Sequence, residues 1–267
     1  MNNVLIIAAN DKYIQHAKSL FANAMNEGKW KGDYCLITDD IYNPEIEKIK
    51  EKGITIKEVK SEDHSFYLKF NIFDVFFKQW KKILYLDCDV MIYKPLELIT
   101  SLPDILYGDP EEWTVKQYFT SWSDEGYHEN GYSGIDKNLV LELEKEFSSI
   151  NNMGYNCGTL FFHSDLIQNN TLELLNFYRN KYEKINKHTG NKFGSDMPII
   201  NLLFLNKWTK IPDNMISYWQ RQDQRTVFSH FCHWHAPWLF NMLSPLGKTY
   251  VEVYRKNLEF FEKKFNL

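Results

Sequence analysis

The sequence predicts an α/β fold in which helices flank a central, mostly parallel sheet. Over residues 4–59, short apolar runs alternate with amphipathic helical segments in the order strand, helix, strand, helix, strand. This order favours parallel strands, because each helix returns the chain to the same edge of the sheet. A further run at 83–86 is apolar at every position, which is typical of a strand buried on both faces.

The bulk composition narrows the possible classes of protein. The 267 residues contain no linker, low-complexity tract or internal repeat, so we expect a single domain over 1–267. The net charge is only −4 without a long block of one sign, so we expect no binding to nucleic acid. Four cysteines lie far apart without a C-x-x-C pair, which favours a reduced, cytoplasmic protein. No stretch approaches the ~20 apolar residues of a transmembrane segment.

The first strand and helix are expected within residues 4–24. The apolar run 4–9 forms the strand, and Asn10 or Asp11 caps the helix. The apolar face of this helix follows the helical period: Tyr13, Ala17, Leu20, Phe21 and Ala24. A strand, a short polar turn and a helix together are the usual opening of a nucleotide-binding fold.

Two further strands, at 35–38 and 54–59, are separated by a short helix. Pro44 after Asn43 suits the first turn of this helix, and Gly53 ends it.

A phenylalanine repeat then predicts another helix that ends near Trp80. Its members follow helical spacing: Phe66, Phe70, Phe73 and Phe77. Lys69 falls in this helix, either as a solvated side chain or as a contact to phosphate.

Two carboxylates follow directly on the strand at 83–86. Asp87 and Asp89 are costly to bury unpaired, and alternation along an extended chain points both side chains the same way. Such a pair of oxygen ligands suits a hard divalent cation at the carboxyl edge of the sheet. The alternative is a polar turn that only caps the strand.

An aromatic-rich insertion is expected at about 106–134. Its aromatic residues lie among Gly, Ser, Asp and Glu without a regular period. A loop of this length is typical of a lid or a binding loop, so the segment forms either a substrate-binding surface or an irregular subdomain.

Helices and strands alternate again after this insertion. A helix at 138–147 precedes a strand at 155–162, and a helical segment at 164–182 follows. Gly158 inside the strand indicates close approach of another backbone or of a ligand. Asn156 beside it can offer an amide to a hydroxyl-rich ligand.

Two polar groups in the last part of the chain are candidates for the same site. Asp196 lies in the first turn of a helix that extends to residue 205, where it can also simply stabilise the helix dipole. The segment 227–235 holds three histidines, which is unusual for a core strand: His230, His233 and His235. An imidazole from this segment can complete a coordination sphere begun by Asp87 and Asp89.

A C-terminal helix is expected at about 248–266. Its apolar stripe comprises Tyr250, Tyr254, Leu258, Phe261 and Phe265. Packing on the core, a homodimer contact and contact with a membrane surface all produce such a stripe. We therefore expect a cytoplasmic protein, with peripheral attachment to a membrane as the alternative.

In this order, the motifs make the chain similar to the retaining glycosyltransferases of family 8, the group of glycogenin and the bacterial lipooligosaccharide galactosyltransferases. The similarity covers residues 4–238. It rests on collinear motifs: Ala8-Ala9-Asn10 with Tyr13, Tyr67-Leu68-Lys69-Phe70, Tyr85-Leu86-Asp87-Cys88-Asp89, Asn156-Cys157-Gly158, Asp196 with Asn201, and His230 with Pro237-Trp238. The resemblance implies a GT-A fold, with a Rossmann-like central mixed sheet that is mostly parallel.

The resemblance also implies roles for these residues. Asp87, Asp89 and His230 would hold Mn²⁺, or Mg²⁺, against the diphosphate of a UDP-sugar donor. Asn156 and Asp196 would be catalytic and orient sugar hydroxyls. The remaining donor contacts would come from Ala8, Ala9, Asn10, Tyr13, Lys69, Cys88, Gly158, His233 and Trp238. The acceptor would be a hydroxyl of a glycan, a glycolipid or a protein.

Departures from the family pattern affect chemistry rather than fold. His233 and Ala236 replace the usual glycine and lysine of the last motif, which leaves the diphosphate one cation short unless His233, His235, Lys69 or another residue supplies the charge. Met197 replaces a glutamine, so no side-chain nucleophile is available there, which fits a mechanism without a covalent sugar-enzyme intermediate; the adjacent Asp196 is the alternative nucleophile. Asn10 replaces an aspartate. A catalytically impaired domain that binds sugar nucleotides is therefore an alternative.

A phosphatase of the haloacid dehalogenase type is the second alternative. Asp87-Cys88-Asp89-Val90 after an apolar strand resembles its first motif, in which one Asp is the nucleophile and the other a general acid. That motif usually lies near the chain start, whereas three strands precede it here.

Overall fold

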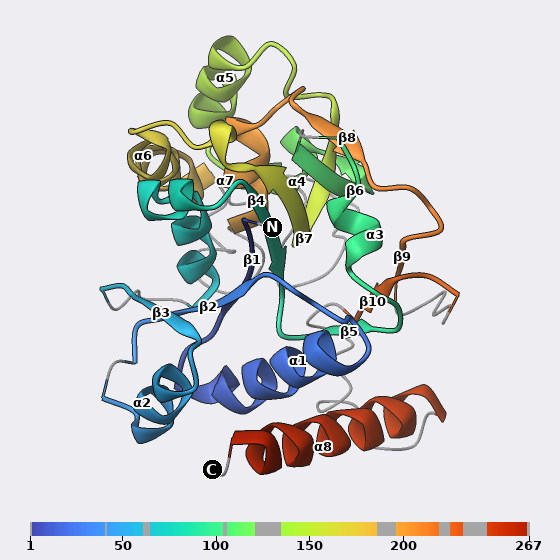
Figure 1. Cartoon of the computed structure of the whole chain (residues 1–267). Helices are drawn as coiled ribbons and strands as arrows, with labels where there is room; N and C mark the ends of the chain where they lie inside the picture. The colour runs from blue at the N-terminus through green and yellow to red at the C-terminus, as the bar shows by residue number, and fades with distance from the viewer. Residues whose placement is uncertain are drawn as a thin grey trace.

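The computed structural model of the chain describes residues 2–40, 42–60, 65–103, 106–120, 135–185, 196–218, 225–231 and 245–265. The main sheet has seven strands (Figure 1). In spatial order they are β3 (Thr55–Glu58), β2 (Asp33–Thr38), β1 (Asn3–Ala8), β4 (Lys82–Leu86), β7 (Met153–His163), β6 (Leu106–Thr114) and β8 (Trp208–Lys210). Only β7 runs antiparallel to its neighbours, so the predicted mixed, mostly parallel sheet is confirmed.

A smaller sheet of three strands lies beside the main one. Its order is β5 (Val90–Ile92), β10 (Phe228–His230) and β9 (Ile216–Tyr218). β10 pairs antiparallel to β5 and parallel to β9. Because β5 follows β4 after a short turn, this sheet brings β10 to the carboxyl end of β4.

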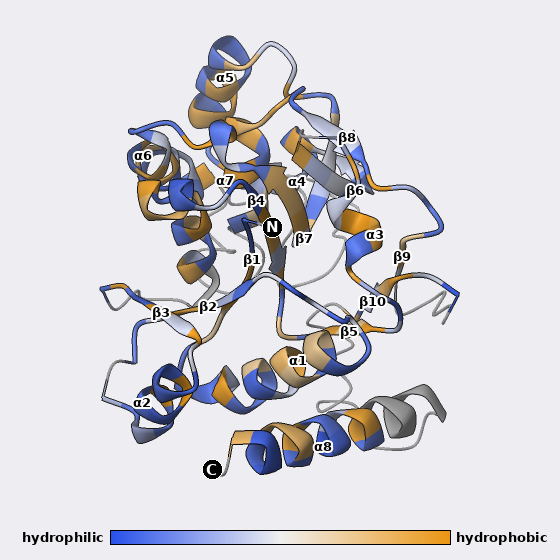
Figure 2. Ribbon diagram, in the orientation of Figure 1, coloured by the Kyte–Doolittle hydropathy of each residue, from blue (hydrophilic) through white to orange (hydrophobic). Residues whose placement is uncertain are grey.

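Helices cover both faces of the main sheet. Their bounds are α1 (Ile14–Asn26), α2 (Pro44–Glu51), α3 (Glu97–Thr100), α4 (Val115–Thr120), α5 (Lys137–Glu146), α6 (Thr171–Tyr182), α7 (Asp196–Leu203) and α8 (Pro245–Phe265). Alternate residues of β1 enter two cores, Val4 on the side of α6 and α7 and Leu5 on the side of α1 and α8. The strands at the centre of the sheet are accordingly coloured hydrophobic (Figure 2).

The C-terminal helix α8 packs along α1 (Figure 1). Phe261 is fully buried in this contact, and the Ser19 hydroxyl donates a hydrogen bond of 3.2 Å to the backbone oxygen of Tyr254. Three members of the predicted apolar stripe, Tyr254, Phe261 and Phe265, therefore have intramolecular partners. A membrane crossing would require a longer apolar helix than any in the part of the chain that the structure describes.

The predicted insertion at 106–134 is wrong for its first part. Residues 106–114 form β6 inside the main sheet, and 115–120 form α4, while 121–134 lie outside the described residues. The sequence pattern missed β6 because Gly108 and Pro110 lie inside the strand, where both residue types are unfavourable.

The phenylalanine repeat does not form one α-helix. Two 3₁₀ segments replace it, Ser65–Phe73 and Val75–Gln79. The break occurs at Asp74, whose carboxylate accepts a hydrogen bond of 2.8 Å from the backbone N–H of Phe76. Because the Asp74 side chain caps the second 3₁₀ segment, the first segment ends before it.

Candidate metal centre and active site

The two predicted carboxylates lie in the turn between β4 and β5. The backbone N–H of Asp87 donates to the oxygen of Gly158 at 2.7 Å, and that of Val90 donates to the oxygen of Asp87 at 3.1 Å. Asp89 is 7% exposed, so its charge needs a partner. The turn thus fixes both carboxylates at the carboxyl end of the central strand.

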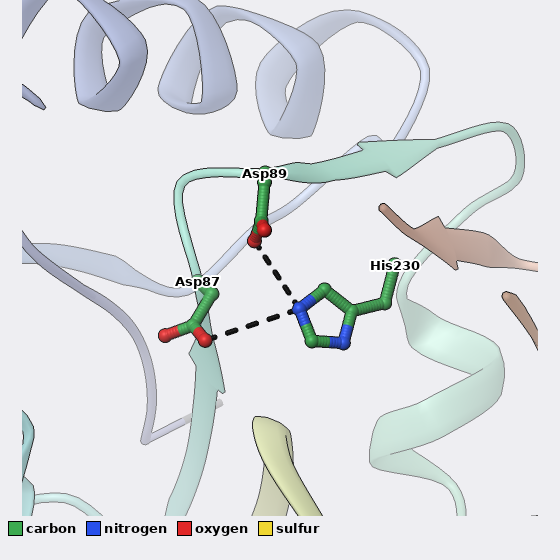
Figure 3. A group of neighbouring side chains, drawn as sticks. All are labelled: Asp87, Asp89 and His230. Carbon is green, nitrogen blue, oxygen red and sulfur yellow. Dashed lines mark ion pairs between the residues drawn. The ribbon is translucent and has the colours of Figure 1, made fainter. Parts of the chain in front are cut away.

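His230 meets these carboxylates because β5 and β10 pair. His230 lies opposite Val90, next to Asp89 in the chain. Its Nε2 is 3.2 Å from Asp89 Oδ1 and 3.9 Å from Asp87 Oδ2 (Figure 3). One ligand atom from each of the three residues lies within 4.8 Å of the others, and His230 is only 4% exposed. Two carboxylates and one imidazole form a donor set that suits Mn²⁺ or Mg²⁺.

Gly158 in β7 makes room for this imidazole. A Cβ at position 158 would overlap the ring of His230. The sequence predicted close approach of another backbone or of a ligand at this glycine, whereas the group that approaches is a side chain of the candidate metal centre.

The charges of the cluster shift the pKa values of the two carboxylates in opposite directions. Burial and the neighbouring Asp89 raise the pKa of Asp87, although Lys69 opposes this shift. Burial also acts to raise the pKa of Asp89, but the adjacent His230 outweighs it and lowers the pKa. Tyr85, two residues earlier on β4, donates a short hydrogen bond to Asp87 Oδ1. In the sequence, Tyr85 belongs to the apolar strand and to the motif with Asp87 and Asp89, but no role was predicted for it, although its spacing from Asp87 placed both side chains on the same face.

Lys69 is not the solvated lysine that one interpretation expected. It is buried, and its Nζ lies 2.7 Å from Asp196 Oδ2 and 3.1 Å from Asp87 Oδ2. Burial alone would lower the pKa of Lys69, but the two carboxylates outweigh it, so the pKa is raised and the ammonium stays charged. Lys69 joins the turn after β4 to the start of α7.

Asp196 opens α7 as predicted, and its contact with Lys69 shows that it does more than stabilise a helix dipole. Asn201, on the same helix, has a structural role. Its side chain accepts from the backbone N–H of Tyr155 and donates to the Tyr155 oxygen, both at 2.8 Å. These bonds fix α7 against β7, which places Asp196 beside the site.

Asn156 lies on β7 between these groups, and its amide is engaged. Its Oδ1 accepts from the backbone N–H of Gly158 at 2.8 Å, and its Nδ2 donates to Glu111 Oε1 at 2.7 Å. Glu111 comes from β6, within the segment expected to be an irregular insertion. Only recognition of β6 as a strand could have placed this carboxylate near the site.

The first motif lies at the same edge of the sheet. Ala8 ends β1, and its backbone oxygen accepts a hydrogen bond of 3.6 Å from Cys88 Sγ. Tyr13 is half-buried, and burial together with the nearby Cys88 and Asp89 raises its pKa. The structure therefore brings the first motif and the carboxylate pair together.

Asn10 does not cap a helix. The chain continues from it into a 3₁₀ turn (Asp11–Tyr13) before α1, and no side chain caps that turn. Asn10 Oδ1 is buried, and no described residue offers it a hydrogen bond. Two other predicted contacts, His233 and Trp238, lie outside the described residues, as do Cys232, His235, Ala236 and Pro237.

The fold and this site define an α/β protein with a two-aspartate, one-histidine cation centre at the carboxyl edge of its sheet. The family model described as Glycosyl transferase family 8 matches residues 5–242. The chain belongs to this family and is a glycosyltransferase, and the predicted family is confirmed. The same match leaves no support for the phosphatase alternative. A search of curated protein sequences finds no match.

Solved structures agree on the fold. The galactosyltransferase LgtC, in complex with donor and acceptor sugar analogues, is similar with a TM-score of 0.65 at 12% identity, over 95% of both chains. The bifunctional glycosyltransferase WbbM has a TM-score of 0.62 at 12% identity, over 95% of this chain and 49% of WbbM. GlyE of Streptococcus pneumoniae TIGR4 has a TM-score of 0.58 at 17% identity, over 98% of this chain and 64% of GlyE. The predicted GT-A fold is confirmed.

Proposed function

We propose that the protein is a retaining, metal-dependent hexosyltransferase that uses a nucleoside diphosphate sugar, UDP-sugar first of all, and a hydroxyl acceptor. The observation that carries this proposal is the convergence of Asp87, Asp89 and His230 within 4.8 Å at the carboxyl end of β4. This position in an open α/β sheet is where ligands bind. The acceptor would be a glycan, a glycolipid or a protein.

The residues of the centre fit the proposed cation. Their atoms offer two hard oxygens and one imidazole nitrogen, and Tyr85 holds the second oxygen of Asp87. A bound Mn²⁺, or Mg²⁺, would supply positive charge that stabilises the departing diphosphate. The burial of Asp89 and His230 strengthens that electrostatic effect, because little water screens it.

The first motif supplies the proposed nucleoside site. The buried Asn10 Oδ1 has no hydrogen-bond donor among the described residues, so a donor group of the ligand would relieve the cost of its burial. Tyr13 keeps part of its ring exposed next to Asp89, where it can stack on a base. Ala8 and Ala9 place small residues at the end of β1, so a nucleoside can approach the backbone.

Lys69 and Asp196 form the proposed sugar side of the site. Because the Asp196 carboxylate is held by Lys69 at 2.7 Å, it accepts sugar hydroxyls in a fixed orientation rather than attacking the anomeric carbon. The acceptor hydroxyl would then attack from the face that the diphosphate leaves, and its proton would pass to the leaving phosphate oxygen. Configuration is retained without the close carboxylate pair of retaining glycosidases.

The proposal is tested by Mn²⁺-dependent release of UDP from a panel of UDP-hexoses, with EDTA as the metal-free control. Asp89→Ala should abolish this release and leave the fold intact, because the variant loses a metal ligand. The matched control is Asp165→Ala. Asp165 is 86% exposed and follows His163, which pairs with Lys82 at the opposite end of β4.

Full activity of Asp89→Ala would end the proposal. A wild-type protein that binds UDP-hexoses with Mn²⁺ but releases no UDP would instead identify the catalytically impaired alternative, which the replacement of the family lysine by Ala236 motivates.

A further inference from the structure

Asn156 cannot present a free amide to a ligand while it keeps its two hydrogen bonds. Its Oδ1 serves Gly158 and its Nδ2 serves Glu111. One Nδ2 hydrogen is left, but the position of the whole amide is set by its protein partners. The group that Asn156 holds in place is the carboxylate of Glu111.

Three positions spaced two residues apart on β7 support a row of side chains from other elements. The ring of Tyr118 lies against Gly154, the Glu111 carboxylate is held at Asn156, and the His230 ring lies against Gly158. Residues two apart in a strand are separated by roughly 7 Å. The strand positions that contact Glu111 and His230 are therefore one such step apart, a separation comparable to the size of a single pyranose ring.

Electrostatic effects agree with this row. The charge of His230 acts to lower the pKa of Glu111, although burial outweighs it and the net shift is upward. Burial raises the pKa of Tyr118, and the charge of Glu111 raises it further. His230 therefore interacts electrostatically with Glu111, and Glu111 with Tyr118.

Two oxygens in this row accept no hydrogen bond from the described residues, and one of them is fully buried. Glu111 Oε1 accepts from Asn156, and Glu111 Oε2 has no hydrogen-bond partner among the described residues. Tyr118 is 8% exposed, and its hydroxyl is likewise without a partner within the described ranges. A buried hydroxyl without a partner is costly, and such groups in a binding site are commonly satisfied by a ligand.

We propose that Glu111 is a specificity-determining residue that accepts a hydrogen bond from a sugar hydroxyl, and that Asn156 is the residue that positions it. An ionised carboxylate only accepts hydrogen bonds, so Oε2 selects a ligand that presents a hydroxyl at that point. This inference rests on the proposed transferase function and assigns Glu111 to it. The hydroxyl belongs to the donor sugar or to a sugar acceptor.

Glu111→Gln isolates the free oxygen. The glutamine keeps an oxygen for the Asn156 amide but replaces Oε2 with an NH₂ group, which donates instead of accepting. The matched control is Glu112→Gln, because Glu112 is the adjacent residue and is exposed. Both variants should bind UDP with Mn²⁺ as the wild type does, since UDP carries no hexose.

The experiment measures kcat/KM for UDP-glucose or UDP-galactose, whichever the wild type uses, and for its single deoxy analogues. Hydrolysis without acceptor tests the donor sugar, and transfer to an alkyl glycoside and its deoxy analogues tests the acceptor. Glu111→Gln should lose roughly 10- to 100-fold on the parent sugar. On one deoxy analogue it should equal the wild type within about threefold, because the missing hydroxyl has already removed the contact.

The arm in which this pattern occurs identifies the sugar that Glu111 reads. Equal losses on every analogue, or kinetics that match Glu112→Gln in both arms, would overturn the inference. If Glu111→Gln misfolds, Glu111→Asp provides the second variant: it keeps the charge on a shorter side chain, and it should lose activity on the parent sugar but match the wild type on one deoxy analogue. A wild type without turnover would remove the proposed function itself, whereas turnover with insensitive Glu111 variants removes only this inference.

Discussion

Two buried lysines, Lys69 and Lys18, have similar surroundings but lie in different parts of the molecule. Lys69 contacts Asp87 and Asp196 in the candidate active site. Lys18, on α1, is 1% exposed and lies 2.8 Å from Glu45 and 3.5 Å from Glu262. Each ammonium therefore joins two carboxylates from separate segments of the chain.

The partners distinguish the two lysines. The side chains of Glu45 and Glu262 are 23% and 44% exposed, so water already solvates part of their charge. Asp196 is 5% exposed, and Asp87 is also a candidate metal ligand. A lysine that compensates buried carboxylates at a ligand edge can take part in binding. A lysine between partly solvated carboxylates of α2 and α8 holds helices together.

Among variants that test this comparison of the two lysines, Lys69→Met has the largest expected effect. The variant leaves the buried Asp196 without its cation, so turnover should fall by about 10²- to 10³-fold, a loss typical of removing one preorganised electrostatic contact. The free energy of unfolding should also fall, by about 3–5 kcal/mol, because an uncompensated charge stays buried. Steady-state kinetics and urea denaturation measure the two effects.

Metal binding provides the control for this variant. Lys69 competes electrostatically with a cation for Asp87 Oδ2, so Mn²⁺ should bind to Lys69→Met at least as tightly as to the wild type. Lys69→Arg should retain much of the activity because it keeps the charge. Wild-type turnover in Lys69→Met would place this lysine in the same structural class as Lys18.

The second prediction applies the same substitution to the other lysine. Lys18→Met should reduce the free energy of unfolding by only about 1 kcal/mol, because its partners are partly solvated and methionine fills the site. Turnover per folded molecule should stay at the wild-type value. A large loss of kcat would contradict the structural assignment of Lys18.

The effect of Lys18→Met should depend on pH. The hydrogen bond from Lys18, with a second from Lys48, lowers the pKa of Glu45 in the folded protein. A carboxylate with a depressed folded-state pKa contributes stability above its unfolded pKa of about 4.3 and loses it as the pH falls through the folded value. The difference between wild type and Lys18→Met should therefore be full at neutral pH and shrink in acid, as urea denaturation across this range would measure.

The sequence singled out the residues of the candidate metal centre, named Lys69 without its partners and passed over Lys18, and the reasons are physical. Asp87 and Asp89 follow a strand that is apolar throughout, and this pattern can be recognised from the sequence because it involves only neighbouring residues. The environment of Lys69 depends on Asp196, more than a hundred residues away, and no local period indicates that contact. From the sequence, Lys69 could therefore be either a solvated side chain or a contact to phosphate, and nothing indicated a role for Lys18.

The same distinction applies to the sheet. β1, β2 and β4 were predictable because their side chains are apolar on both faces. β6 was not, because Gly108 and Pro110 interrupt its pattern and its pairing with β7 has shifts in register. Glu111 was missed together with β6, because a residue assigned to an irregular loop cannot be placed next to particular residues of the sheet.

The smallest expected effect is that of Ser19→Ala, which tests how far the structural region around Lys18 is separate from the site. Its hydroxyl donates to the Tyr254 oxygen at 3.2 Å, so its loss should cost about 0.5–1 kcal/mol of unfolding free energy and leave kcat unchanged. The ring of Tyr254 also packs against that of His16, with 4.9 Å between the ring centroids and a tilt of 37°, and Asp89 acts to raise the pKa of His16 against its burial. Tyr254 and Val253 of α8 also pack against Met91 and Phe231, which lie within two residues of candidate metal ligands in the chain. Lower kcat at unaltered stability would therefore show that α8 helps to position the metal centre, and the separation between the two lysine regions would no longer hold.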